Sequence, residues 1–242
     1  MEDPSPGPPL PVLVVTGMAR EARLAKAPGV VTIHAGGLPY RLRDALVRQA
    51  QVRCRAVISF GIAGGLDPFL GPGDVVVATG VVSHTVRWPV QPLLAQNLAS
   101  SLTSGGMKVK LADLAGADAP LLHPTDKRVL KTETGAAAVD MESHLAAAYA
   151  AERRLPFAAV RVICDPADRR LPPWAAESLL PNGEVSAAAV VRGLLRRPPH
   201  LFAMVRLAID AAAAFRALRR CRELLGVGFG VPDLGQSLPD MT

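Results

Sequence analysis

The chain has 242 residues, half of them apolar, which is enough for one large hydrophobic core and does not require a second domain. Aromatic side chains make up only 4% of the residues, so small aliphatic side chains must fill the core between layers. The formal net charge is +6, but the basic residues of segment 192–222 are hardly interleaved with aromatic side chains that could stack on bases, which argues against a nucleic-acid-binding protein.

The apolar runs predict strands that alternate with helices along the chain. Strands are expected at 11–18, 30–34, 56–60, after the Pro72-Gly73 turn, at 108–114 as an edge strand, at 136–141 and at 157–164. Helices are expected at 22–25, 38–51, 93–102, 125–132, 142–154 and, broken at Pro198-Pro199, at 185–225. This order predicts an α/β fold with three layers, in which helices flank a central, mostly parallel sheet.

The domain boundaries follow from the composition of the two ends. A single domain is expected over 11–225, after a proline-rich, disordered lead-in at 1–10 and before a loose, glycine-rich and proline-rich tail at 226–242. The lead-in does not have the pattern of a secretory signal. No apolar run is long enough to cross a bilayer, so membrane contact could only be peripheral, through the basic helices of 185–225.

The cysteines do not indicate a metal site or a disulfide framework. Cys54, Cys164 and Cys221 lie far apart, form no CxxC pair and have no histidine at the spacing of metal ligands. We therefore expect reduced thiols in a cytoplasmic protein that binds no metal.

Polar residues at the carboxyl ends of the predicted strands are the first candidates for a site, because ligands of open parallel sheets bind there. The glycines of Gly61–Gly65 would let the backbone approach a sugar or phosphate closely, although a plain tight turn explains them equally well. The pattern is not GxGxxG, and neither is the turn after the first strand, so a dinucleotide site is disfavoured.

Two carboxylates at strand ends each have a structural and a catalytic interpretation. Glu142 at a helix start either interacts with the helix dipole or accepts the hydroxyls of a ribose. Asp165 ends an apolar strand, where loss of water contacts would keep it protonated and able to donate a proton to a departing purine. From the residues alone, Asp165 is better explained as the cap of the turn Asp-Pro-Ala-Asp.

Three segments in this order resemble the nucleoside phosphorylase and nucleosidase superfamily: SFGIAGGLDP at 59–68, GAAAVDMES at 135–143 and RVICDPAD at 161–168. The flanks of the last two, and the Leu-Pro-Asn-Gly segment near residue 180, resemble its hopanoid-biosynthesis branch in particular. The resemblance implies a phosphorylase-like fold, no cofactor, and cleavage of the N-glycosidic bond of a purine nucleoside. For the hopanoid branch it implies release of adenine from adenosylhopane to give ribosyl- or phosphoribosyl-hopane.

The resemblance also implies roles for individual residues. Asp165 corresponds to the general acid and Glu21 to the carboxylate that orients water. Arg20 or Arg23 could instead hold phosphate. The predicted contacts to the substrate come from the first turn, the glycine segment, the strand-to-helix junction and the last strand: Gly17, Gly64, Gly65, Met141, Glu142 and Cys164. Cys164 stands where a small polar residue is usual in the family.

Two departures from the family pattern leave the attacking group open. Ile62 replaces a polar residue of the glycine segment, and Ser59 stands where phosphate-using relatives often have an arginine. Water and inorganic phosphate therefore both remain candidates. A soluble adenine nucleoside such as methylthioadenosine is the alternative substrate, and a catalytically idle binding module is the alternative from another class. The resemblance further implies a homo-oligomer.

Overall fold

The strands of the computed structural model form one mixed sheet. The structure describes residues 9–171 and 201–231. The strand order is β2-β1-β3-β7-β6-β4-β5, and β8 pairs with both β3 and β4, so that β3, β7, β6, β4 and β8 close into a ring. The strands are β1 (Val12–Thr16), β2 (Val30–His34), β3 (Ala56–Gly65), β4 (Val75–Ser83), β5 (Val86–Pro89), β6 (Val109–Gly116), β7 (Ala138–Asp140) and β8 (Phe157–Asp165).

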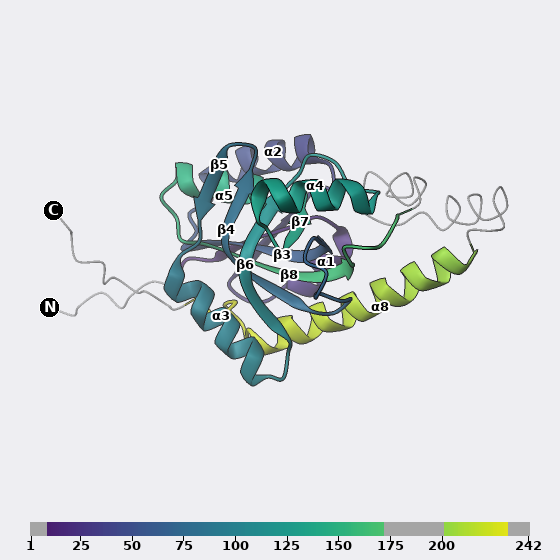
Figure 1. Ribbon diagram of the computed structural model, residues 1–242. Coiled ribbons are helices and arrows are strands. Elements are labelled where there is room, and N and C mark those ends of the chain that lie inside the picture. Colours follow the sequence, from purple (N-terminus) through teal and green to yellow (C-terminus); the bar gives the residue numbers. More distant parts are fainter. Residues whose placement is uncertain (1–8, 172–200, 232–242) are drawn as a thin grey trace, which may run out of the picture.

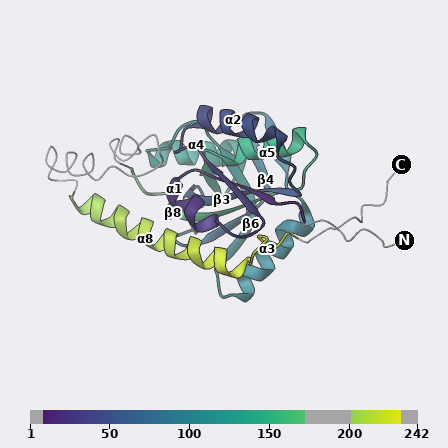
Figure 2. The same ribbon diagram turned by 180° about the vertical axis from the view of Figure 1, so that it is seen from behind.

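Helices cover the sheet on both sides. Figures 1 and 2 show α2, α4 and α5 on one side, and α3 and the long α8 on the other. The helices are α1 (Ala19–Ala25), α2 (Pro39–Arg48), the 3₁₀ turn η1 (Gln49–Gln51), α3 (Pro92–Ser104), α4 (Pro124–Thr134), α5 (Ser143–Glu152) and α8 (Leu201–Leu224). The predicted three-layer α/β fold in one domain is thus confirmed. Of the expected helical segment 185–225, residues 185–200 lie outside the described residues.

Burial follows the prediction from composition. All residues of β1 and of β8 are buried, and the core consists mostly of Ala, Val, Leu and Ile. Strands covered on both faces read as continuous apolar runs because neither face meets water. The exceptions in β8 are Asp165 at its end and Arg161, whose side chain is fully buried among apolar neighbours of the strand.

The glycine segment is a strand and not the expected turn. Gly61, Gly64 and Gly65 belong to β3, which continues to Gly65 and pairs with β8 and β7. None of the three has the positive φ that a tight turn would require. A Cβ at Gly61 would lie 2.5 Å from Arg161 Nη1, and one at Gly64 would lie 3.1 Å from Asp165 Oδ2. The glycines thus make room for charged side chains above the strand.

Two further expectations need correction. The segment expected as an edge strand, 108–114, became β6, which lies between β4 and β7. Because β7 pairs with β6 only from Leu114 onward, the first half of β6 keeps the partly exposed pattern of an edge. Phe229 and Val231, expected in the loose tail, pack on the core: Phe229 is fully buried and meets Phe60 edge to face at 5.1 Å.

Candidate functional site

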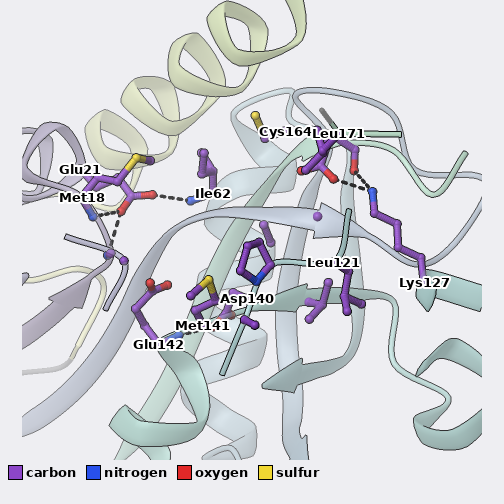
Figure 3. A pocket seen from close by; sticks show the side chains of 18 residues that line it. Met18, Glu21, Ile62, Leu121, Lys127, Asp140, Met141, Glu142, Cys164 and Leu171 are labelled. Atoms are coloured by element: carbon purple, nitrogen blue, oxygen red, sulfur yellow. Dashed lines mark hydrogen bonds and ion pairs between the residues drawn. The ribbon is translucent and has the colours of Figure 1, made fainter. Parts of the chain in front are cut away.

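One cavity collects most of the residues that the sequence suggested. It has a volume of about 210 Å³ and is lined from the β1–α1 connection, β3, the β7–α5 junction, α4 and the end of β8. Figure 3 shows Glu21 and Glu142 on one side of this space and Lys127 on the other. We call the first side the acidic end (Glu21 and Glu142) and the second the lysine end (Lys127 and Asp165).

Glu21 is fixed at the acidic end by backbone amides. Its Oε2 accepts hydrogen bonds from the amides of Gly17 (2.8 Å) and Met18 (2.7 Å), and its Oε1 accepts one from Ile62 (2.8 Å; Figure 3). Burial raises the pKa of Glu21, while the Arg161 charge and the three amides oppose this shift. A buried carboxylate with a raised pKa can accept a proton from a water molecule near neutral pH.

Glu142 is available to a ligand because another residue caps α5. The Oδ1 of Asp140 accepts hydrogen bonds from the amides of Glu142 (2.8 Å) and Ser143 (2.6 Å), whereas the Glu142 side chain makes no capping hydrogen bond. The carboxylate of Glu142 lies against Gly17, where an added Cβ would be 2.6 Å from Oε1. This geometry favours the ligand-binding interpretation of Glu142 over the capping interpretation.

Arg161 places a positive charge beside the carboxyl groups of the acidic end. Its Nε lies 3.0 Å from Asp140 Oδ2 and its Nη1 lies 3.4 Å from Glu142 Oε2. Its Nη2 donates a hydrogen bond of 2.6 Å to the hydroxyl of Ser59, the residue that stands in place of the family's arginine. A fully buried guanidinium is tolerated because these partners satisfy it.

Asp165 lies at the lysine end because of an irregularity in β8. The register with β3 shifts after Ala63, so that the extra residue Cys164 bulges and Asp165 lies opposite Gly64. The side chain is paired with the ammonium group of Lys127, whose Nζ is 2.5 Å from Oδ2. Burial raises the pKa of the Asp165 carboxyl, as the sequence predicted, while the Lys127 charge opposes the shift.

The other predicted residues divide into those that reach the cavity and those that do not. Gly64, Met141 and Cys164 line it, but Gly65 faces the backbone of Pro166 and Ala167. Burial raises the pKa of the Cys164 thiol to about 12, so this thiol is neutral.

The two candidate phosphate ligands do not line the cavity. The guanidinium of Arg20 stacks on Phe215 of α8, at 4.0 Å from the ring centroid. Arg23 lies on the same short helix, α1.

Sequence reasoning missed Arg161, Asp140 and Lys127. Arg161 had a signal, since it is the one charged residue within an apolar strand, and such a residue needs buried partners. Lys127 had a weaker one: it stands three residues before Leu130 on a helix and so shares its inward face. Nothing local indicates that its partner would be 38 residues away.

Comparisons with known proteins agree with this geometry. The family model described as "Phosphorylase superfamily" matches residues 12–196. The chain belongs to this superfamily. No curated protein matches. Enzymes of the phosphorylase superfamily are of the nucleoside phosphorylase and nucleosidase type, and they need no cofactor. Among the described residues, no group of three or more His, Cys, Asp or Glu could hold a metal ion.

Solved structures of the superfamily share the fold at low sequence identity. The futalosine hydrolase of Helicobacter pylori strain 26695 is 16% identical, with a TM-score of 0.61 over 77% of this chain and 97% of its own. The methylthioadenosine/S-adenosylhomocysteine nucleosidase of S. pneumoniae is 16% identical, with a TM-score of 0.62 over 89% and 100%. The S-adenosylhomocysteine nucleosidase of Streptococcus pyogenes is 16% identical, with a TM-score of 0.63 over 90% and 98%.

Replacing Arg161 with methionine should destabilise the protein strongly at neutral pH. The change leaves buried carboxylates without their counter-charge, which costs about 3–5 kcal/mol. The loss should shrink at pH 5.5, because burial raises the pKa of Glu21 and of Glu142 and both carboxyl groups are more fully protonated there. Urea unfolding at pH 7.5 and 5.5 measures the loss of free energy of unfolding at each pH. Arg220→Met, at an exposed arginine, should stay within about 0.5 kcal/mol of the unmodified protein. An equal loss at both pH values would contradict the proposed charge balance.

The stability of the unmodified protein should fall as pH rises. Burial raises the pKa of Glu142 from 4.5 to about 8, so between these values the folded state binds more protons than the unfolded state. The contribution of one such group cannot exceed about 1.4 kcal/mol per pH unit. Glu142→Gln removes this titrating group, so the free energy of unfolding of the variant should depend less on pH. Glu223→Gln, at an exposed site, should keep the pH dependence of the unmodified protein. Identical slopes in Glu142→Gln and the unmodified protein would contradict this pKa shift.

Proposed function

We propose that the protein hydrolyses the N-glycosidic bond of a purine nucleoside, with Asp165 as the general acid and Glu21 as the general base. The observation that supports this most is the placement of two buried carboxyl groups at opposite ends of one cavity. Glu21 lies beside Gly61 and Asp165 lies beside Gly64 of the same strand. Three residues of a strand span roughly 10 Å, which leaves room for a sugar and a base between the two groups.

The reaction assigns one step to each group. The O–H bond of Asp165 breaks and its proton moves to a ring nitrogen of the purine, while the electrons of the N-glycosidic bond leave with the base. A water molecule held by Glu21 attacks the anomeric carbon and gives a proton to Glu21. Glu142 accepts the ribose hydroxyls, with Met141 beside the sugar. The developing positive charge of the oxocarbenium-like sugar is stabilised by the carboxyl oxygens of the acidic end.

Water is favoured over phosphate because of the charge around Glu21. Three carboxyl groups, those of Glu21, Asp140 and Glu142, surround the single guanidinium of Arg161. Neither Arg20 nor Arg23 reaches the cavity to add positive charge. The guanidinium of Arg161 is already engaged by Asp140 and Glu142, so it leaves no uncompensated positive charge for an incoming phosphate. A neutral water molecule needs no such counter-charge.

We propose adenosylhopane as the substrate, on the resemblance to the hopanoid-biosynthesis branch. The cavity volume of about 210 Å³ is below the roughly 300–1,000 Å³ of sites that enclose a drug-sized ligand. A site of this size suits the nucleoside head of a larger molecule whose tail remains outside. Methylthioadenosine is the second candidate, because the structural neighbours include methylthioadenosine/S-adenosylhomocysteine nucleosidases.

A lipid-linked substrate would bring the protein to a membrane surface, and we propose a cytoplasmic protein with peripheral contact through α8. No helix within 9–171 and 201–231 is long and apolar enough to span a bilayer. Val205 and Ile209 of α8 are exposed, and Arg206 and Arg216 on the same helix are exposed too. Exposed apolar and basic side chains on one helix favour binding to anionic lipid.

We also propose that the chain forms a homo-oligomer through a second hollow of about 490 Å³ between α2, α5 and the β4–β5 hairpin. Val47 and Val86 at this hollow are 72% and 46% exposed, and a second copy would cover them.

The substrate and the attacking group can be tested in one experiment. The purified full-length chain is incubated with adenosylhopane or methylthioadenosine, each with and without inorganic phosphate, and the sugar product is identified by mass spectrometry. We expect adenine and ribosylhopane irrespective of phosphate. Phosphoribosyl-hopane would overturn the choice of water, and turnover of methylthioadenosine alone would favour the second candidate. If neither adenosylhopane nor methylthioadenosine releases adenine, the result favours a catalytically idle binding module.

Removing either carboxyl group should abolish most of the activity without unfolding the protein. Asp165→Asn and Glu21→Gln should each lower kcat by on the order of 10²-fold or more, because each removes a proton-transfer group. Asp168→Asn changes an exposed residue of the same loop and should retain full activity. Circular dichroism verifies the fold of each variant. Full activity in Asp165→Asn would refute the role of this residue.

A further inference from the structure

Lys127 is a buried lysine that the proposed reaction has not yet used. Its side chain is 1% exposed, and it extends from α4 to the lysine end of the cavity (Figure 3). Its ammonium group donates to Asp165 Oδ2 at 2.5 Å, to the carbonyl of Pro166 at 2.9 Å and to the carbonyl of Asp165 at 3.4 Å. These acceptors match the three N–H bonds of an ammonium group, so they hold the Lys127 side chain in one place.

This arrangement distinguishes the two oxygens of Asp165. An ammonium group has no acceptor, so the oxygen that it contacts must act as an acceptor. We propose that Lys127 is the positioning residue of the general acid: by occupying Oδ2, it directs the transferable proton of Asp165 to Oδ1 and stabilises the carboxylate that remains after transfer. The proposal deepens the proposed function and rests on it for the identity of the reaction, but the pairing itself is a property of the described residues.

The effect on the proton transfer follows from the charges around Asp165. Lys127 from α4 and Arg169 from the following loop are the cations that lower its pKa, and burial raises it. Arg169 is itself paired with Asp210 of α8 at 2.8 Å, which weakens its influence. The neighbouring Cys164 thiol is neutral. Lys127 is therefore the principal group that makes the buried carboxyl a strong enough acid to release its proton.

The proton balance of the step is unchanged by this role. The Oδ1–H bond breaks, the proton moves to the purine nitrogen, and the electron pair stays on the carboxylate beside the ammonium group. Lys127 keeps its own proton throughout. The carboxylate of Asp165 regains a proton from solvent after adenine leaves, while Glu21 returns the proton taken from water.

Lys127→Met tests the role, because methionine fills a similar volume without charge. The pKa of Asp165 is measured in the full chain by NMR of aspartate labelled with ¹³C at the side-chain carboxyl, with Asp165→Asn identifying the signal. We expect this pKa to rise by about 1–3 units, since an opposite charge close by has been removed. Lys131→Met, one turn further along α4 at a lysine whose ammonium group donates to the Gly135 carbonyl, is the matched control and should leave the pKa unchanged.

Kinetics separate positioning from a purely structural role. At a pH where Asp165 is protonated in both proteins, kcat of Lys127→Met should fall by about 10-fold or more while KM stays within about 2-fold, because a weaker and less oriented acid slows only the chemical step. The decline of activity at high pH should move upward together with the pKa of Asp165. Lys127→Gln, which keeps a donor but no charge, should show the same pKa rise with a smaller loss of kcat.

Two results would overturn the proposal: an Asp165 pKa in Lys127→Met equal to that of the unmodified protein, or an unchanged kcat at the protonated plateau. Thermal unfolding shows whether Lys127→Met is folded, and Lys127→Gln answers the same question if it is not. If the pKa rises in the variants but no protein releases adenine, the pairing of Lys127 with Asp165 stands and the proposed function fails.

Discussion

The site depends on one buried guanidinium. Among residues 9–171 and 201–231, Arg161 is the cation that acts on Asp140, Glu142 and Glu21, and each of these carboxyl groups has a separate task. Asp140 caps α5, which orients the β7–α5 junction, and Glu142 is left free to face the cavity. Glu21 anchors the β1–α1 connection through two amides and β3 through a third. Because isolated buried charges are very costly, removing the guanidinium would disturb the geometry of three elements at once.

The second constraint is the lack of a side chain at two positions of β3, Gly61 and Gly64. Gly61 leaves space for Glu21 and Arg161, and Gly64 leaves space for Asp165. Any Cβ at Gly61 would meet these charged groups at less than 3 Å. The two glycines therefore let charged groups from β8 and α1 approach β3 closely. The residues that were expected to form a tight turn belong to the strand along which the site is built.

The sequence predicted the fold better than the site because most strands are continuous apolar runs, whose burial is decided locally. β2 was expected at its observed residues, and β8 within one residue, for this reason. Asp165 and Glu142 could be found because they follow such runs. Lys127 and Arg161 were missed, since their roles depend on partners in other elements, brought close by the closure of the sheet through β8. The glycines were misread because close approach and turn formation require the same residue type.

The charges at the two ends of the cavity differ in a way that suits a bond breaking between them. The carboxyl groups of Glu21 and Glu142, with Asp140 beside them, surround one guanidinium near the acidic end, whereas one ammonium group faces one carboxyl group at the lysine end. When an N-glycosidic bond breaks, positive charge develops on the sugar and negative charge on the leaving base. A sugar at the acidic end would meet carboxyl oxygens, and a base at the lysine end would meet an ammonium group and a proton donor. Because these groups are already fixed by hydrogen bonds, they would need little rearrangement during the reaction, and this pre-arranged field distinguishes cleavage from mere binding of a nucleoside.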